Sequence, residues 1–151
     1  MHNIRNSVRA IIIDKGEIIL TKNKEAYGIN YYLPGGGQNF KEELTETVKR
    51  ECKEEIGLVV VPEKCVFVRE YIGEKHKFKE TDSDIHQVEF YFICSILERS
   101  EPTKIDERQI SWLSVPLEKF YKYKQNFYPQ SLIPYIMAEN FSNLIFLGSD
   151  I

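Results

Sequence analysis

Cysteine is scarce in this sequence of 151 residues, and its placement argues against two classes of protein. The three cysteines are Cys52, Cys65 and Cys94, an odd number with wide gaps and no C-x-x-C pair. We therefore expect neither a disulfide framework nor a cysteine-based zinc site, and a reducing cytoplasm is the compartment that fits best.

Long apolar runs are also missing. The start of the chain carries only a short apolar run, residues 10–13, before Asp14 interrupts it. Such a run is too short for the apolar region of a signal peptide or for a membrane span. We therefore expect no association with a membrane.

An excess of charge of one sign is absent as well. Twenty Lys and Arg residues face 23 Asp and Glu residues, for a net charge of −3. This balance gives no reason to expect nucleic acid as a partner. With 42% hydrophobic residues and no visible repeat, low-complexity tract or linker, the sequence predicts a single globular domain over residues 1–151. It leaves open whether that domain forms a homodimer.

Short β-branched and alternating segments predict several strands. Residues 7–14 and 18–20 flank a turn-like stretch and predict a β-hairpin. In residues 85–97 apolar side chains alternate, so that one face carries Phe90, Phe92 and Cys94 and the other carries Glu89 and Tyr91. Further strands are expected at residues 31–33, 58–61, 66–72, 110–115 and 144–147, and loops at residues 23–30 and 73–84.

A helix is predicted over residues 42–56. Its apolar positions, Leu44, Val48, Cys52 and Ile56, recur every fourth residue, and Gly57 is placed to end the helix. Residues 117–121 and 132–140 are further helix candidates. Because strands and helices mix without regular alternation, we predict a mixed sheet flanked by helices.

Three carboxylates crowd one edge of the predicted helix, just after a run of glycines. Glu51, Glu54 and Glu55 lie within about one turn of each other, and their mutual repulsion is relieved only by water or a cation. Mg²⁺ prefers hard oxygen ligands and often shares them with substrate phosphates. The segment therefore predicts a site for Mg²⁺ or Mn²⁺ and a phosphorylated ligand, although an acidic helix face exposed to solvent is the simpler alternative.

The surrounding residues fit the pattern G-x5-E-x7-R-E-U-x-E-E-x-G-U, where U is apolar. The matching positions are Gly36, Glu42, Arg50, Glu51, Cys52, Glu54, Glu55, Gly57 and Leu58. This segment resembles the signature box of the Nudix hydrolases. Two positions depart from family habit, namely Cys52, where a larger aliphatic residue is usual, and Lys41, where many members have glycine.

The resemblance implies a fold and a reaction. Nudix hydrolases have an α/β/α sandwich with a central mixed sheet, and with divalent metal ions they cleave the diphosphate linkage of a nucleoside diphosphate joined to another group. A small-molecule nucleotide is thus the expected substrate. A proline typical of members that cleave ADP-ribose is replaced by Gly73, and the tyrosine typical of diadenosine polyphosphate hydrolases is missing from residues 74–76. A nucleoside triphosphate and a nucleotide sugar remain as possible substrates.

The resemblance also implies roles for individual residues. Glu51, Glu54 and Glu55 are the expected metal ligands, together with the backbone carbonyl of Gly35. Arg50 is expected to orient a catalytic glutamate through charged hydrogen bonds. Glu42 is in turn expected to hold Arg50.

The general base is open between two positions. Glu55 is our first choice for a role as ligand or base, whereas in one branch of the family the base lies on a loop, where this chain has Glu107. For Glu107 itself, the favoured interpretation is one acid in a charged surface loop. Two other functions stay in view: a catalytically inactive Nudix-like domain that senses nucleotides, and a structural metal-binding domain.

Overall fold

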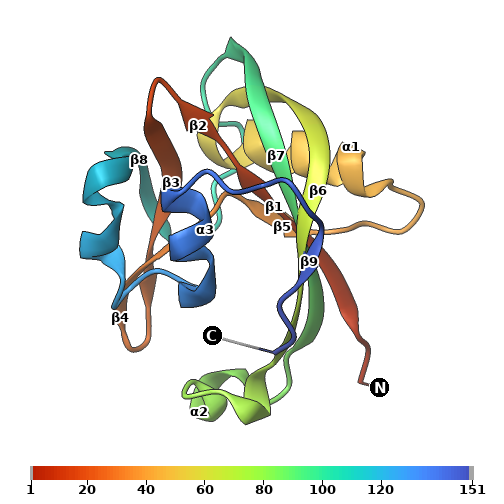
Figure 1. Cartoon of the computed structure of the whole chain (residues 1–151). Helices are drawn as coiled ribbons and strands as arrows, with labels where there is room; N and C mark the ends of the chain where they lie inside the picture. The colour runs from red at the N-terminus through yellow and green to blue at the C-terminus, as the bar shows by residue number, and fades with distance from the viewer. Residues whose placement is uncertain (1, 150–151) are drawn as a thin grey trace.

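The computed structural model describes residues 2–149 and contains two β-sheets with helices packed outside them (Figure 1). The strands of the larger sheet, in spatial order, are β5 (Gly35–Gly37), β1 (Arg5–Ile11), β7 (His86–Arg99), β6 (Leu58–Ile72) and β9 (Ile145–Phe146). The smaller sheet consists of β2 (Ile13–Asp14), β3 (Glu17–Glu25), β4 (Gly28–Tyr32) and β8 (Gln109–Pro116).

The larger sheet is mixed. β1 runs parallel to β7, β6 runs antiparallel to β7, and β9 runs parallel to β6. Helix α1 (Leu44–Ile56) covers one face, and the short helix α3 (Ile133–Met137) lies on the opposite side (Figure 1). The prediction of an α/β/α sandwich around a mixed sheet is therefore confirmed.

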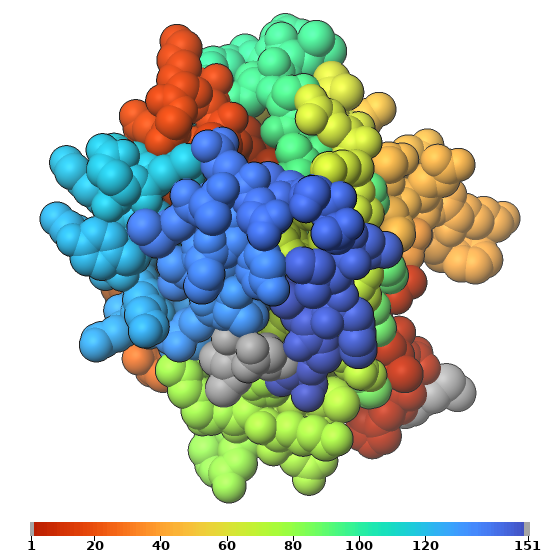
Figure 2. All heavy atoms as spheres, in the orientation of Figure 1, coloured from red at the N-terminus to blue at the C-terminus, as the bar shows by residue number. Residues whose placement is uncertain are grey.

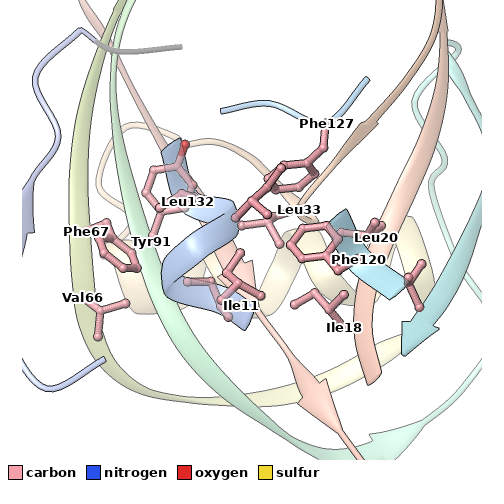
Figure 3. Packing of buried hydrophobic residues seen from close by; sticks show 13 residues of the cluster. Ile11, Ile18, Leu20, Leu33, Val66, Phe67, Tyr91, Phe120, Phe127 and Leu132 are labelled. Carbon is pink, nitrogen blue, oxygen red and sulfur yellow. The ribbon is translucent and has the colours of Figure 1, made fainter. Parts of the chain in front are cut away.

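Two clusters of buried side chains form the core, one on each face of the larger sheet. Val48, Cys52 and Ile56 of α1 pack with Phe92 and Cys94 in one cluster. The other cluster contains Phe67, Tyr91, Phe120, Phe127 and Leu132, and Figure 3 shows these side chains around the helical C-terminal segment. The alternation predicted for β7 is confirmed, since its successive side chains divide between the two clusters.

Two predicted loops are wrong. Residues 23–30 are the tip of a β-hairpin, because β3 continues to Glu25 and β4 begins at Gly28. Polar side chains hid these strands, whose backbone groups are satisfied by antiparallel pairing. Residues 73–84 contain the 3₁₀ helix η1 (Gly73–Lys75) and the short helix α2 (Lys79–Asp82).

The remaining elements differ from prediction mainly in their ends. The first hairpin is confirmed as β2 and β3, but β1 lies in the other sheet. The predicted strands at residues 58–61 and 66–72 are one strand, β6, with irregular pairing between them. Residues 117–123 form the 3₁₀ helix η2, and η3 (Gln130–Leu132) precedes α3, which is shorter than expected.

The C-terminal segment spreads over the face of the molecule seen in Figure 2, and the segment around α2 lies directly below it. Among residues 2–149, no helix has both the length and the hydropathy that a membrane crossing requires.

Candidate active site

Both ends of α1 are fixed by local contacts. At the start, the backbone amide of Glu43 donates a hydrogen bond to Oε2 of Glu46 at 2.8 Å. At the end, Gly57 adopts a left-handed conformation with φ of 67°, and its amide donates to the carbonyl of Lys53. Glycine takes this conformation at little cost, so the sequence itself sets where the helix stops.

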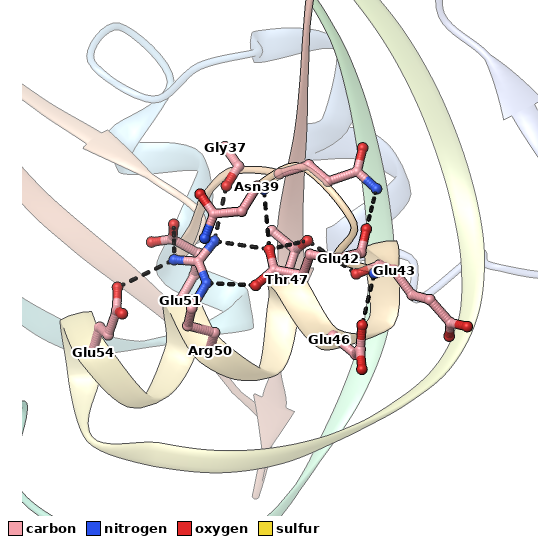
Figure 4. Close-up of polar contacts among 10 residues, drawn as sticks. Gly37, Asn39, Glu42, Glu43, Glu46, Thr47, Arg50, Glu51 and Glu54 are labelled. Atoms are coloured by element: carbon pink, nitrogen blue, oxygen red, sulfur yellow. Dashed lines mark hydrogen bonds and ion pairs between the residues drawn. The ribbon is translucent and has the colours of Figure 1, made fainter.

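Arg50 is the centre of a polar network on α1 (Figure 4). Its guanidinium donates two hydrogen bonds to the carboxylate of Glu42, at 2.8 and 3.0 Å. It also donates to Glu51 at 2.8 Å, to Glu54 at 3.3 Å and to the carbonyl of Gly37 at 2.9 Å. One arginine thus ties the helix to the glycine strand and holds two of the expected metal ligands.

Glu42 is strongly held in this network. Hydrogen bonds from Arg50, with a further one from Thr47, lower the pKa of Glu42 to about 2. The pKa of Arg50 is raised, with its hydrogen bond to Glu42 as the largest cause. Both side chains therefore stay charged at neutral pH. The two hydrogen bonds place Glu42 where it can hold the guanidinium of Arg50.

The glycine strand β5 brings backbone close to the carboxylates. A Cβ atom added to Gly36 would lie 2.5 Å from the carboxylate of Glu51, so a side chain here would displace that group. Gly35 has φ of 153°, and a Cβ there would lie 2.0 Å from the carbonyl oxygen of Val8 in β1. Glycine is needed at both positions because each backbone segment is approached closely, at Gly36 by the carboxylate of Glu51 and at Gly35 by the main chain of β1.

Glu55 is the acid of the box whose pKa is raised. Burial raises its pKa to about 7, although the charge of Arg9 and the hydrogen bond from Gly35 act in the opposite direction. The amide of Gly35 donates to Oε2 of Glu55 at 3.1 Å. A carboxyl whose pKa lies near neutrality can both accept and release a proton under physiological conditions.

A cavity of about 710 Å³ opens beside these residues. Gly35, Glu51 and Glu55 line it, and Glu107 lines it from the loop before β8. The loop is docked there because the side chain of Gln109 donates to the backbone carbonyl of Glu55 at 2.9 Å. The structure thus brings Glu107 to the same cavity as two of the box glutamates.

The other predicted site residues, Glu42, Arg50 and Glu54, do not line the cavity. The side chain of Glu54 is 25% exposed and faces Arg50. Glu54 therefore belongs to the Arg50 network and not to the lining of the cavity, although it is adjacent in sequence to Glu55.

The donor set suits a hard cation, although no metal site is preassembled. Within residues 2–149, no group of three or more His, Cys, Asp or Glu side chains is arranged to hold an ion as it stands. Arg50 explains part of this, since it engages Glu51 and Glu54. The negative charge of Glu51 adds to the raised pKa of Glu55, so a divalent cation between these carboxylates would relieve a repulsion that is present in the structure.

Sequence reasoning missed the charged residues on the floor of the cavity. Arg9 donates to the carbonyls of Leu33 at 3.2 Å and Gly35 at 3.4 Å, so the carbonyl expected to bind metal already has a donor nearby. Arg69 and Glu89, cross-strand partners in β6 and β7, form a buried ion pair at 2.7 Å. One sequence signal could have revealed these residues: each is a charged residue in an otherwise apolar strand, at a position whose side chain points into the fold.

Comparison with known proteins identifies similar sequences and structures. The family model for the NUDIX domain matches residues 3–134. A search of curated proteins finds no match.

A NUDIX hydrolase from Nitrosomonas europaea superimposes with a TM-score of 0.76 at 14% identity, covering 95% of this chain and 94% of that one. A UDP-X diphosphatase gives 0.72 at 16% identity, covering 97% and 68%. An ADP-ribose pyrophosphatase from Streptococcus suis gives 0.65 at 19%, covering 97% and 99%. At these identities the likeness of structure concerns the fold.

Proposed function

Because the chain belongs to the Nudix hydrolase family, we propose that it cleaves the diphosphate linkage of a nucleoside diphosphate derivative with the help of Mg²⁺ or Mn²⁺. The observation that carries this proposal is the wall of the cavity, where Glu51 and Glu55 lie against the glycine strand. A nucleoside triphosphate or a nucleotide sugar is the proposed substrate. The names of the similar structures, which include a UDP-X diphosphatase, support a substrate of this kind.

The carboxylates of Glu51, Glu54 and Glu55 and the carbonyl of Gly35 are the proposed metal ligands. A bound divalent ion would act as a Lewis acid, lower the pKa of its water and neutralise charge on the leaving phosphate. Glu54 would join the set by turning from Arg50, to which its 3.3 Å contact is the longest that this guanidinium makes to a carboxylate.

The protein's own groups would position water and accept its proton. Glu55 is our first choice to accept the proton at a carboxylate oxygen, because its carboxylate lines the cavity and is held by a hydrogen bond from the amide of Gly35. Arg50, fixed by Glu42, orients Glu51 through its 2.8 Å hydrogen bond. Glu107 is the alternative base and lies on an exposed loop that lines the same cavity.

A screen of nucleoside diphosphate derivatives and nucleoside triphosphates with Mg²⁺ and with Mn²⁺ tests the proposal. Phosphate release after coupling to a phosphatase reports cleavage. We expect turnover of at least one compound, and we expect Glu55→Gln to reduce kcat by roughly 10²- to 10⁴-fold, the usual contribution of a positioned base. Near-wild-type turnover in both Glu54→Gln and Glu55→Gln would overturn the mechanism.

Glu107→Gln decides between the two candidate bases. We expect its kcat to stay within about tenfold of wild type, because its loop is exposed and Glu55 is the better buried acid. A loss that equals that of Glu55→Gln would instead make Glu107 the base. Glu101→Gln, an exposed acid of the same connection that does not line the cavity, is the matched control.

A further inference from the structure

Arg9 brings a positive charge to the floor of the cavity, beside the acids of the signature box. It is half-buried and lines the cavity together with Gly35 and Glu55. Its Nη1 donates to two backbone carbonyls, those of Leu33 at 3.2 Å and Gly35 at 3.4 Å. Among residues 2–149, no carboxylate forms an ion pair with Arg9. Arginines that leave the surface usually have such a partner, so the charge of Arg9 is poorly neutralised.

The buried acid of the floor does not supply the missing partner. Glu89 acts on Arg9 through its charge, but its carboxylate is already engaged. It accepts hydrogen bonds from Arg69 at 2.7 Å and from Tyr91. Two positive charges thus face one negative charge, and the excess reaches the signature box. Burial raises the pKa of Glu55, and the charge of Arg9 opposes that rise.

The hydrogen bond to Gly35 sets how close Arg9 would be to a cation on the same carbonyl. Mg²⁺ lies about 2.1 Å from its oxygen ligands, so an ion on this oxygen would be within about 5.5 Å of Nη1 of Arg9. At that separation a unit positive charge weakens the binding of a divalent ion by about tenfold even with the dielectric constant of water. Partial burial reduces screening and strengthens the repulsion.

The same guanidinium has donors to offer to an anion. Within the part of the chain that the structure describes, Nε and Nη2 of Arg9 make no hydrogen bond, since both of its bonds come from Nη1. A guanidinium binds phosphate oxygens through such N–H groups. Arg9 should therefore act on a metal ion and on a phosphate group with opposite signs.

We propose that Arg9 is a built-in cation beside the metal site, which weakens the binding of free Mg²⁺ and strengthens the binding of a diphosphate. The assignment of the Gly35 carbonyl as a metal ligand rests on the proposed function. A nucleoside triphosphate that carries one Mg²⁺ keeps a net negative charge. Arg9 thus attracts that complex while it repels the free ion, so the protein takes up metal together with substrate.

Isothermal titration calorimetry tests the two signs separately and needs no hydrolysis. The probes are Mg²⁺ alone and inorganic pyrophosphate in EDTA. Measurements at about pH 9 keep Glu55, whose pKa is about 7, in its ionised form. We expect Arg9→Gln to bind Mg²⁺ at least about tenfold more tightly than wild type and pyrophosphate about tenfold more weakly. A merely structural role for Arg9 predicts that both ligands bind more weakly.

Three further variants separate charge from shape. Arg9→Met keeps an apolar stem and should repeat the result of Arg9→Gln, which guards against a misfolded variant. Arg9→Lys keeps the charge and should leave both affinities within about threefold of wild type. Arg108→Gln removes a charge from a side chain that lines the same cavity, pairs with Glu25 and is 68% exposed. It should change the affinity for Mg²⁺ by no more than about twofold, because water screens its charge.

The inference is overturned if the two neutral variants bind Mg²⁺ no more tightly than wild type, if pyrophosphate binds them equally well, or if Arg9→Lys behaves like Arg9→Gln. The result is separable from the hydrolysis screen. Opposite shifts for Mg²⁺ and pyrophosphate without turnover of any nucleotide would refute the proposed reaction and keep the role of Arg9. Turnover with unchanged affinities in the Arg9 variants would do the reverse.

Discussion

Two arginine–glutamate pairs differ in exposure, and only the second of them lines the cavity. Arg50 and Glu42 are joined at 2.8 Å, with side chains that are 27% and 16% exposed. Arg69 and Glu89 are joined at 2.7 Å, with side chains that are only 5% and 6% exposed. The distances are alike, so the difference in burial decides what each pair does to stability.

Burial changes the cost of breaking a pair. Water can solvate Arg50 if Glu42 is removed, and Arg50 keeps three other hydrogen bonds, to Glu51, Glu54 and the carbonyl of Gly37. Glu89 instead receives hydrogen bonds from Arg69, Tyr91 and Gln87 inside the fold. Removing the charge of Glu89 would leave a buried guanidinium poorly compensated, which is the costly case.

Glu89→Gln should produce the largest loss of stability. We expect the free energy of unfolding to fall by about 3 kcal/mol, the low end for breaking a buried pair, because glutamine keeps the shape and loses the charge. Urea denaturation at pH 7 measures it. Glu98→Gln, at an exposed position of the same strand, is the control. A loss below about 1 kcal/mol would mean that the two clusters do not differ as proposed.

Glu55 extends the comparison to a carboxylate whose burial outweighs the nearby charge of Arg9. Its pKa is about 7 in the folded protein against an ordinary value of 4.5. The folded state therefore binds more protons between these pH values, and stability falls as pH rises from 5 to 8. In EDTA, wild type should lose about 2 kcal/mol more than Glu55→Gln over this range. Parallel urea-denaturation profiles for the two proteins would contradict the assignment.

Glu42→Gln should have a smaller effect on stability than Glu89→Gln. We expect a loss of about 1–2 kcal/mol, since the pair is partly exposed and Arg50 keeps other acceptors. Turnover should fall by about tenfold, because Arg50 loses the forked contact that fixes its plane. Urea denaturation and kcat measure the two effects, with the exposed Glu118→Gln as control. Unchanged kcat would show that Glu42 does not act through Arg50.

Substitutions at Lys41 should change the free energy of unfolding least. Lys41 adopts φ of 67° in the loop before α1. This is the position at which many Nudix hydrolases have glycine. Glycine removes the strain of that conformation but loses more entropy on folding, so Lys41→Gly should stabilise by no more than about 0.5 kcal/mol. Lys41→Val should destabilise by about 1 kcal/mol, because a β-branched residue tolerates positive φ poorly. Thermal denaturation measures both changes, with Tm expected to rise slightly in Lys41→Gly and to fall in Lys41→Val.

The clusters also differ in how visible they are in sequence. Arg50 and its acids lie within one helix and the loop before it, where spacing of a few residues fixes which side chains meet. The C-terminal end of α1 and the packing of Cys52 followed from that spacing, the helix starts two residues later than predicted, and the contact between Glu42 and Arg50 was implied by the resemblance to the family. The sequence by itself determined the helix, its apolar stripe and the family to which the chain belongs, because all three depend on neighbours along the chain.

Only the tertiary structure decided which charges share the cavity. Arg69 meets Glu89 because β6 pairs with β7 in one register, and a shift by one residue would send both side chains to the other face. Glu107 reaches the cavity because Gln109 docks on the end of α1. Tyr27, Phe78 and Tyr128 meet although no short-range pattern links them. Contacts of this kind depend on strand register and loop docking, which are set by burial of the whole core and leave no local periodicity to read.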